Sequence, residues 1–339
     1  MAGRMKRWCL RDHGSLDNLE MEDSPAPEPG PGEVVVRIRA AALNARDLMI
    51  AIGPSPYGPK PGLVPLSDGA GEVIACGSGV TGVAPGARVV IPFRPGWIDG
   101  PHDPAAMVTD LGGAVDGVLA EQIAVPARAV VSLPDAISFE QAAMLPCAGV
   151  TAWTALDRGG PLGAGHSVLV MGTGGVSLFA LQIARAKGCR VIATTSSEAK
   201  AQRLRDLGAS EVIDYRACPE WDARVRELTG GRGVDRIVEV GGAGTLPRSM
   251  AALAPEGEIA LIGLLDDPMS LISPLPLMRT MGVIRGISVG SRADLVNLVE
   301  CAARNFEPVI DRIFDFGDAP AAYAHLASRR HFGKVVIRV

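Results

Sequence analysis

The 339 residues of this chain are enough for about two domains of ~150 residues each. Apolar residues make up 47% of the chain and charged residues 21%, which excludes an intrinsically disordered protein. The net charge of −4 leaves no strongly basic surface, so we expect neither nucleic acid nor an anionic membrane as a partner.

The N-terminal segment and the thiols favour a cytoplasmic protein. Residues 1–14 are basic but lack the apolar stretch of a signal peptide, and no run of ~18 apolar residues follows. The six cysteines form no CxxC pair, and the five histidines form no HExxH motif. Scattered, unpaired cysteines are typical of a reducing compartment and offer no ligand cluster for a structural zinc ion.

Short strands and long loops dominate the first ~130 residues. Residues 33–43, 70–77 and 87–93 have the apolar pattern of strands. Loops rich in proline and glycine occupy residues 24–33 and 52–69. These features predict an irregular, β-rich domain.

From residue 167 onward the pattern changes to alternating strands and helices. The predicted strands are apolar runs at residues 167–172, 189–195, 210–215, 234–241, 258–264 and 283–290. The predicted helices lie between them at residues 176–188, 198–208, 219–231 and 245–257. A helix over 293–305 and a strand over 334–339 complete the chain. The alternation is typical of a doubly wound parallel sheet with helices on both faces.

A glycine-rich turn, GTGGVS at residues 172–177, joins the first strand of this alternation to its helix. Gly172 would allow the tight turn, and Gly174 would let the backbone approach a pyrophosphate. The N–H groups at the start of the helix would then bind the anion. Ser177 replaces the third glycine of the fingerprint, and a small residue still permits close packing. An ordinary turn is the alternative, but the position at the first strand–helix junction favours a dinucleotide site.

The end of the second strand indicates which dinucleotide binds. A carboxylate there would bind the 2′-hydroxyl of NAD, but residues 193–197 read ATTSS and Glu198 belongs to the next helix. Ser196, Lys200 and Arg203 are close in sequence and suit a 2′-phosphate, which favours NADPH. The alternative is that the two cations are solvated helix charges.

Several stretches together resemble the medium-chain dehydrogenase/reductase superfamily, and within it the zinc-free quinone oxidoreductase branch. They are AALNARDLM (41–49), VPLSDGAGEVIACGSGV (64–80), LPCAGVTAWTAL (145–156), GTGGVSLFALQIARAKG (172–188), LGASEVIDYR (207–216), RGISVGSR (285–292) and HFGKVVI (331–337). The resemblance implies an α/β protein with a GroES-like β-barrel catalytic domain, residues 1–133 plus 287–339, and an inserted doubly wound Rossmann domain, residues 134–286. It also implies a homodimer formed by pairing the edges of the two Rossmann sheets, to which residues 269–275 could contribute.

The resemblance also bears on the metal. Zinc-dependent members carry a Cys–His step at the positions of Asn44 and Ala45, and a His–Glu step at the positions of Ser67 and Asp68. Their third ligand lies near the position of Cys147, and their structural-zinc lobe with four cysteines corresponds to residues 92–116, which hold none. Since Asn and Ser are poor zinc ligands, we expect no metal. Cys147 is interpreted as a packing or pocket residue, with a metal ligand or a nucleophile as alternatives.

Four residues are candidates for catalysis. Asn44 could donate from its amide, and Ser67 belongs to the same lost metal site. Tyr57 lies in the loop where related quinone reductases place a tyrosine near the substrate. Asp47 completes the NxxD stretch, and a structural hydrogen bond in a tight bend is an equal alternative. Arg46 could reach a phosphate or substrate, or point to water.

The predicted cofactor-binding residues lie in the glycine turn, at strand ends or in stretches that resemble the family. The resemblance assigns Lys200 and Tyr215 to the 2′-phosphate and Thr151 to the surroundings of the nicotinamide. Lys334 resembles a late lysine that faces the cofactor, with a strand-end charge as the alternative. The full set is Thr151, Gly172, Gly174, Gly175, Val176, Ser196, Lys200, Tyr215, Gly241, Gly263, Leu264, Gly290 and Lys334.

Without zinc, hydrogen bonds must stabilise the negative charge that develops on the acceptor as hydride arrives. A conjugated enone or a quinone spreads this charge, whereas a simple ketone needs stronger polarisation. The leading hypothesis is a zinc-independent, NADPH-dependent oxidoreductase that transfers hydride to a quinone or conjugated enone. The alternatives are a zinc-free alcohol or carbonyl oxidoreductase of the same fold and a non-enzymatic NADPH-binding protein.

Overall fold

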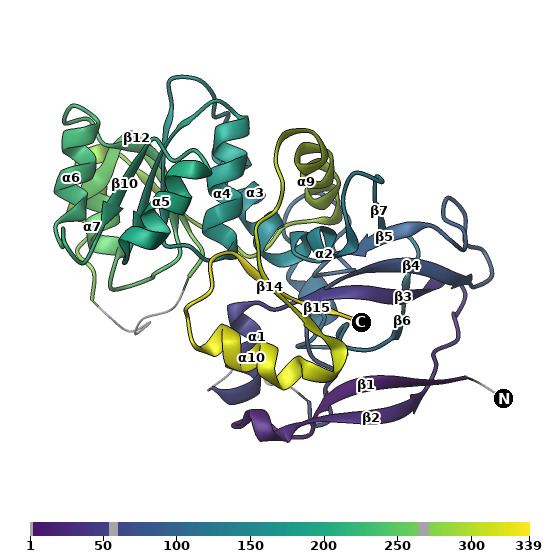
Figure 1. Ribbon diagram of the computed structural model, residues 1–339. Coiled ribbons are helices and arrows are strands. Elements are labelled where there is room, and N and C mark those ends of the chain that lie inside the picture. The colour runs from purple at the N-terminus through teal and green to yellow at the C-terminus, as the bar shows by residue number, and fades with distance from the viewer. Residues whose placement is uncertain (1–2, 54–59, 264–270) are drawn as a thin grey trace. The chain divides into compact units, whose positions relative to one another are not determined.

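The computed structural model describes residues 3–53, 60–263 and 271–339 (Figure 1). Its backbone contacts divide the chain into two compact units. The first unit comprises residues 1–150 and 289–339, and the second comprises residues 151–288.

The first unit is rich in strands. They are β1 (Arg4–Leu10), β2 (Leu19–Pro25), β3 (Glu33–Ala42), β4 (Asp68–Cys76), β5 (Arg88–Ile91), β6 (Gln122–Pro126), β7 (Val131–Ser132), β14 (Ile310–Asp315) and β15 (Lys334–Arg338). Its helices and short helical turns are η1 (Leu16–Asn18), α1 (Ala45–Ile52), η2 (Pro104–Thr109), α2 (Phe139–Ala142), η3 (Leu145–Gly149), α9 (Arg292–Asn305), η4 (Phe316–Asp318) and α10 (Ala319–Ala327).

The main sheet of the first unit is built around β3. The strand order is β14-β15-β3-β4-β5-β7, and β6 pairs with the first half of β3. Val34, Val36 and Ile38 of β3 lie in the apolar core because successive side chains of a strand point to opposite faces. The pairing of β15 with β3 brings the C-terminal strand beside residues 40–42. The β-rich domain predicted from the sequence is confirmed.

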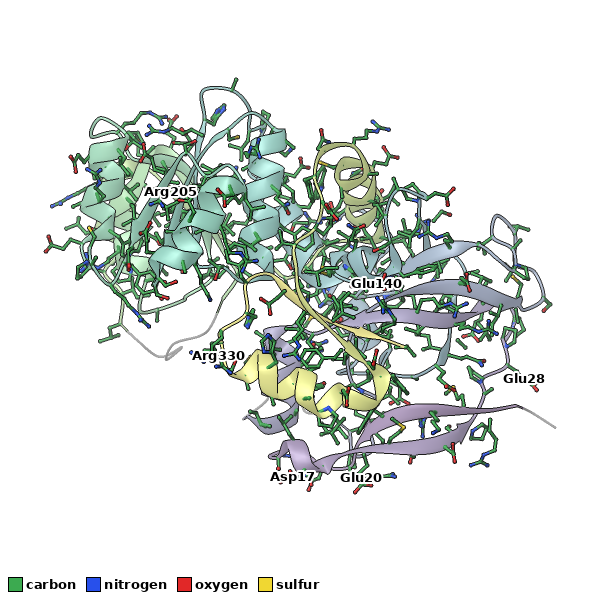
Figure 2. All side chains as sticks on the ribbon, in the orientation of Figure 1. Asp17, Glu20, Glu28, Glu140, Arg205 and Arg330 are labelled. Carbon is green, nitrogen blue, oxygen red and sulfur yellow. The ribbon has the colours of Figure 1, made fainter. Side chains whose placement is uncertain are left out.

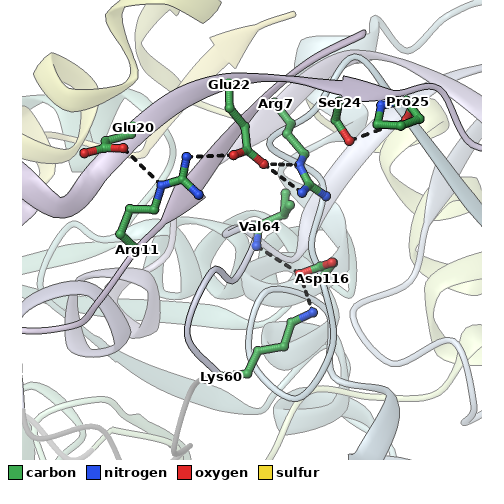
Figure 3. A network of polar contacts seen from close by, with 9 residues as sticks. All are labelled: Arg7, Arg11, Glu20, Glu22, Ser24, Pro25, Lys60, Val64 and Asp116. Carbon is green, nitrogen blue, oxygen red and sulfur yellow. Dashed lines mark hydrogen bonds and ion pairs between the residues drawn. The ribbon is translucent and has the colours of Figure 1, made fainter. Parts of the chain in front are cut away.

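Charged cross-strand pairs help to fix the register of the N-terminal hairpin, which is formed by β1 and β2. Arg7 lies opposite Glu22 in the ladder, and its Nε donates to Glu22 Oε1 over 2.7 Å. Arg11 bridges two acids of β2, Glu20 and Glu22, as Figure 3 shows. Exposed ion pairs contribute only ~0–1 kcal/mol each, so their main effect here is to specify the register. Burial of Trp8 on the other face supplies the stability.

The boundary after the first segment lies later than the predicted one at residue 133. Residues 139–149 form α2 and the π-helical turn η3, and both pack on β4 of the first unit. Ser138 caps α2 through a bond from the Gln141 N–H to its Oγ. The chain therefore enters the second unit only at residue 151.

The second unit alternates strands and helices. The strands are β8 (Ser167–Met171), β9 (Arg190–Thr195), β10 (Glu211–Asp214), β11 (Val234–Glu239), β12 (Leu253–Leu261) and β13 (Val283–Gly286). The helices are α3 (Val150–Asp157), which begins at the boundary, α4 (Gly175–Ala186), α5 (Glu198–Asp206), α6 (Trp221–Leu228), α7 (Leu246–Ala252) and α8 (Leu275–Thr280).

All strands of the second unit run parallel in the order β10-β9-β8-β11-β12-β13. From β8 the chain first builds outward to β10, and then returns to the other side of β8 with β11. The crossover connections place helices on both faces of the sheet, as Figure 1 shows. The doubly wound Rossmann domain predicted from the sequence is confirmed.

Two elements differ from the prediction. The helix expected over residues 245–257 ends at Ala252, because Pro255 lacks an N–H and biases Ala254 towards an extended conformation. β12 therefore begins at Leu253. The sequence pattern also gave no sign of β14, since Phe314 is the one residue of this strand that is classed as buried. Over the residues described, no helix is long and apolar enough to span a membrane.

Candidate active site

The carboxyl ends of the parallel strands gather most of the predicted cofactor residues of the second unit. Gly172 follows β8, Ser196 follows β9 and Tyr215 follows β10. Gly241 follows β11 and Gly263 follows β12, and these two strands lie beyond β8 in the strand order. The strand order reverses between β8 and β11, and ligands of open α/β sheets bind in the crevice at this switch point. The sheet thus brings these five residues to one edge.

The glycine turn has the geometry of a phosphate-binding loop. Gly172 has φ +72°, a left-handed conformation that favours glycine, and its N–H donates to Thr194 O over 2.9 Å. α4 begins directly afterwards at Gly175, so the first N–H groups of the helix have no intrahelical acceptor. A Cβ atom at Gly174 would meet no atom within 4 Å, which leaves the turn open for a ligand. Ser177 is buried, and its Oγ donates to Met171 O over 2.6 Å, which ties the helix to the strand.

The end of β9 carries hydroxyl and basic groups instead of a free acid. Ser197 caps α5 by accepting from the Lys200 N–H over 3.2 Å. The Tyr215 N–H donates to Thr195 O over 3.0 Å, so the Tyr215 backbone lies beside the end of β9. Glu198, the nearest acid in the sequence, forms an ion pair of 2.8 Å with Arg205, which Figure 2 labels on α5. The acid nearest to the end of β9 in the sequence is therefore engaged in an ion pair.

Sequence reasoning missed Glu239, which is fully buried at the end of β11. Its Oε1 accepts from Gly241 N over 2.8 Å and from Thr245 Oγ1 over 2.6 Å, and its Oε2 accepts from Ser249 Oγ. The carboxylate therefore fixes the glycine loop that follows the strand. An acid inside the apolar run VDRIVEVG was the signal that could have revealed it.

The first unit holds a buried polar cluster of Asn44, Ser67, Asp68 and Lys334, each no more than 8% exposed. Lys334 Nζ donates to Asn44 Oδ1 over 2.6 Å and to Leu43 O over 2.5 Å. It lies 3.7 Å from Asp68 Oδ2, and Ser67 Oγ donates to Asp68 Oδ1 over 2.7 Å. Two predicted catalytic residues, Asn44 and Ser67, are thus brought together. Lys334, predicted to bind the cofactor, bonds to Asn44, a contact that the sequence did not predict.

The Asn44 amide is satisfied at one end only. Its Oδ1 accepts from Lys334, whereas its Nδ2 is buried and has no hydrogen-bond partner among the described residues. A buried donor without a partner costs ~1–3 kcal/mol. A buried donor of this kind can bond to a water molecule or to a ligand.

Asp47 makes the structural hydrogen bond that was the alternative to catalysis. Its Oδ2 accepts from the Asn44 N–H over 2.7 Å at the start of α1. Burial raises the pKa of Asp47 to about 6, although the Arg46 guanidinium opposes this shift. Arg46 itself points inward, since its Nη1 donates to Leu111 O over 2.9 Å and its guanidinium lies 4.6 Å from the Phe93 ring centroid.

Cys147 lies in the π-helical turn η3 and packs against Phe93, Trp97 and Val289. Its N–H donates to Asp68 Oδ2 over 3.3 Å. Burial raises the pKa of the thiol well above its usual range, with the Asp68 charge adding to the effect. A thiol that stays protonated is a poor nucleophile, so the geometry favours the packing interpretation.

An ion pair holds the lobe of residues 92–116. Arg94 Nε donates to Asp110 Oδ1 over 2.5 Å and Arg94 Nη2 to Asp110 Oδ2 over 2.9 Å, and both residues are at most 3% exposed. A bidentate arginine–carboxylate pair is among the stronger polar contacts in proteins. It joins the two ends of the lobe across 16 residues.

Strained backbone precedes the cluster. Leu66 has φ +68° and is fully buried directly before Ser67. A left-handed conformation costs a residue with a Cβ atom roughly 1–2 kcal/mol. A Cβ atom at Gly117 would lie 1.9 Å from Leu66 O, so glycine is required there for the two backbones to approach. The packing thus holds Ser67 and Asp68 in place from outside the cluster.

The buried polar cluster of Asn44, Ser67, Asp68 and Lys334 does not fit a catalytic zinc ion. The ammonium of Lys334 already lies among Asn44 Oδ1, Leu43 O and Asp68, and a divalent cation there would meet a like charge. In residues 3–53, 60–263 and 271–339, no group of three His, Cys, Asp or Glu side chains could hold a metal ion. Amide and hydroxyl groups are in any case weak zinc ligands.

Tyr57 and Leu264 lie outside the described residues. Thr151 is buried in α3, where its carbonyl accepts from Thr154 Oγ1. Gly290 is buried directly before Ser291, which caps α9.

Two family models match the chain. One is described as a zinc-binding dehydrogenase and covers residues 175–304, and the other as an alcohol dehydrogenase GroES-like domain covering residues 30–135. A zinc-type alcohol dehydrogenase-like protein of Schizosaccharomyces pombe is 39% identical over 98% of this chain and 99% of its own length. A quinone oxidoreductase of Pseudomonas aeruginosa is 33% identical over 98% and 99% of the two chains.

Solved structures agree over the full length. A putative alcohol dehydrogenase from Sinorhizobium meliloti is 41% identical with a TM-score of 0.91, covering 100% of both chains. A structure titled NAD-dependent alcohol dehydrogenase is 36% identical with a TM-score of 0.89, covering 99% and 100%. A mycobacterial protein complexed with NADPH is 29% identical with a TM-score of 0.82, covering 99% and 100%. The chain therefore belongs to the medium-chain dehydrogenase/reductase superfamily of oxidoreductases, with a GroES-like domain and a Rossmann domain.

Proposed function

We propose that this protein is a zinc-independent, NADPH-dependent oxidoreductase that transfers hydride to a quinone or conjugated enone. The observation that carries the proposal is the buried pair of Lys334 and Asn44, in which an ammonium and an amide stand among residues that do not fit zinc. An amide donor suits an acceptor whose developing charge is delocalised, since such an acceptor needs only modest polarisation.

The cofactor of the protein is a nicotinamide dinucleotide, and NADPH is the form that the second unit favours. The end of β9 has Ser196 and, in the next helix, Lys200, while Glu198 is paired with Arg205. The mycobacterial relative with bound NADPH supports this choice, whereas the relative titled NAD-dependent supports NADH. We favour NADPH because serine and lysine can both donate to a phosphate.

The residues of the first unit then have distinct tasks in the reaction. When bound, NADPH supplies hydride from nicotinamide C4 to the electrophilic carbon of the acceptor. Asn44 Nδ2 donates to the acceptor oxygen as it gains negative charge, and water supplies the proton that completes the reduction. Asp68, which accepts a hydrogen bond from Ser67, lies beside the ammonium of Lys334, and this ammonium bonds to the oxygen end of the Asn44 amide.

The decisive experiment follows NADPH oxidation by EDTA-dialysed protein given a conjugated enone, with the product identified. A saturated ketone would establish metal-free reduction of the C=C bond. An allylic alcohol would show carbonyl reduction instead, which is the second function that the alcohol dehydrogenase-like relatives support. Activity that disappears on dialysis and returns with added zinc would contradict the proposal.

We also infer that the protein forms a homodimer through the edge of the second unit. Among the described residues, β13 is the last strand of its sheet; Val283 within it is 45% exposed, and Met278 and Met281 just before it are 69% and 70% exposed. An unpaired edge with apolar neighbours is a typical interaction surface. Sedimentation equilibrium should give twice the chain mass, and Met278→Glu with Met281→Glu should give the monomer. A monomeric unmodified protein would contradict the inference.

A further inference from the structure

A cavity of about 270 Å³ lies in the second unit, near the amino ends of three adjacent strands. Its walls come from residues 159–166, which lead into β8, from residues 232–236 at the start of β11, and from residues 255–258 in β12. The predicted cofactor residues follow the carboxyl ends of these strands, so the cavity lies at the other edge of the sheet. Ligand pockets begin at about 300 Å³, so this volume suits only a small molecule.

The cavity wall contains a buried cation, Arg236, which is 2% exposed. In the sheet Arg236 pairs with Val168 of β8 and with Glu258 of β12. Its Nη1 donates to Ala155 O over 2.6 Å, whereas its Nε is buried and has no hydrogen-bond partner among the described residues. A buried donor of this kind is available to a bound water molecule or ligand.

The planar guanidinium makes Nε and Nη2 of Arg236 a pair of donors. The Nε–H and one N–H of Nη2 run parallel, and this fork matches the two oxygens of a carboxylate. Nη2 lies against Gly159 of the cavity wall, since a Cβ atom added there would be 2.4 Å from it. Glycine at this position therefore keeps the space beside the fork open.

The buried acids near Arg236 already have other partners. Glu258, which is 6% exposed, accepts from Arg285 Nε over 3.1 Å and from Arg285 Nη2 over 3.2 Å. Arg236 Nη1 stays 3.9 Å from the same carboxylate. Asp235 forms an ion pair of 2.7 Å with Arg232. Two arginines thus share one carboxylate, which leaves one positive charge of the wall without full compensation.

The remaining ionisable residues of the wall limit the charge of a ligand. His166 Nδ1 lies 3.3 Å from Gly163 O, and Glu256 is exposed. Burial lowers the pKa of the Arg236 guanidinium, Glu258 opposes this effect and Arg285 adds to it. A single negative charge beside Arg236 would complete the compensation. The carboxylate of Glu256 disfavours a phosphate, which carries close to two negative charges.

We propose that this cavity binds a small monocarboxylate, whose two oxygens accept from Nε and Nη2 of Arg236. The apolar part of the ligand packs against the wall formed by Pro161, Leu162 and Pro255. Along β11 Arg236 precedes Glu239 by three residues, roughly 10 Å in a strand, so the site is separate from the cofactor edge. The inference goes beyond the proposed reaction and does not depend on it.

Titration calorimetry of the full chain with butyrate tests the site. Butyrate should bind saturably, one molecule per chain, with a Kd of about 10 mM or below. Butyramide has the same shape without the charge and should bind at least about tenfold more weakly, because it loses the charge-assisted bonds. Absence of saturable butyrate binding, or equal affinity for the two compounds, would overturn the proposal. Sulfate that bound more tightly than butyrate would refute the assignment to a monocarboxylate.

Variants of the wall test the role of the fork. Arg236→Lys keeps the charge but removes the fork, and Gly159→Ala fills the space beside it, so each should weaken butyrate by about tenfold or more. Arg190→Met is the matched control, since Arg190 is an exposed arginine at the start of β9, outside the wall. It should change the affinity by less than about twofold. Thermal unfolding verifies that each variant is folded. Unchanged butyrate affinity in Arg236→Lys and Gly159→Ala would refute the proposal.

A competition experiment tests the position of the site. If butyrate binds at the amino ends of the strands, NADPH and butyrate should bind to the same chain at the same time. The Kd of butyrate measured with saturating NADPH should then be within about twofold of the value without it. A Kd of NADPH that rose in proportion to the butyrate concentration would place butyrate at the cofactor edge and overturn the proposal.

Discussion

The two units build their candidate sites from different parts of the polypeptide. In the second unit the candidate site is formed mainly by backbone. It consists of the turn at Gly172, the start of α4 and the carboxyl ends of the parallel strands. In the first unit the site consists of buried side chains with charges of both signs, such as Asp68 and Lys334. A backbone site tolerates many side-chain changes, whereas a cluster of buried charges depends on every member.

The largest expected effect comes from removing one charge of the buried cluster. Asp68→Asn leaves the ammonium of Lys334 without its carboxylate, and breaking a buried pair in this way costs about 3–5 kcal/mol. We expect the free energy of unfolding, measured in urea, to fall by this amount.

The matched change in the second unit is Glu198→Gln, which removes one partner of the exposed pair with Arg205. Exposed pairs contribute ~0–1 kcal/mol, so the unfolding curve should barely move. Similar losses in the two variants would contradict the distinction between the units.

The next effect is a pH dependence that belongs to the first unit. Burial raises the pKa of Asp47 to about 6 from its ordinary value of 3.8. The folded protein therefore binds this proton more tightly than the unfolded chain, and stability from this group is present below about pH 4 and lost as the pH rises through about 6. At ~1.4 kcal/mol per pKa unit, the loss is about 3 kcal/mol.

Asp47→Asn should remove this pH dependence. The difference in unfolding free energy between the variant and the unmodified protein should change between pH 4 and pH 7 by about 3 kcal/mol. Asp135→Asn, which changes a fully exposed carboxylate, is the control and should give parallel profiles. If Asp47→Asn also gave a parallel profile, the titration of Asp47 would not couple to folding.

The smallest expected effect concerns cofactor choice in the second unit. Lys200→Ala with Tyr215→Phe should weaken NADPH by tenfold or more, because hydrogen bonds to a charged phosphate contribute ~1.5–3 kcal/mol. NADH lacks this phosphate and should lose much less. Dissociation constants from nucleotide fluorescence would measure both, with Arg205→Ala on the same helix as the control. Equal losses for the two nucleotides would refute the assignment of these residues to the 2′-phosphate.

The sequence predicted the parts of the molecule that rest on local pattern. The glycine turn and most of the apolar strands and helical stripes of the second unit appear within a few residues of their predicted bounds, because each is determined by neighbours in the chain. Glu239 could have been noticed as an acid in an apolar strand. The helix expected over 245–257 was wrong at its end because the effect of Pro255 on the preceding residue was not taken into account.

The cluster of the first unit was only partly predictable. Asn44 and Ser67 were identified from the family resemblance, but the contact between Lys334 and Asn44 depends on the pairing of β15 with β3. Neither residue has a local pattern that reveals the other, because a ladder between distant strands brings them together. The same holds for Leu66, whose backbone conformation depends on Gly117 in another segment.

The pair of Arg94 and Asp110 has a consequence for the chemical durability of the lobe at residues 92–116. A lobe held by four thiolates around zinc can be opened by oxidants or chelators, since both remove the thiolate–metal bonds. A guanidinium–carboxylate pair has no redox chemistry and binds no metal. The lobe of this protein should therefore stay folded under peroxide stress and metal starvation, conditions under which a zinc-thiolate lobe would lose its shape.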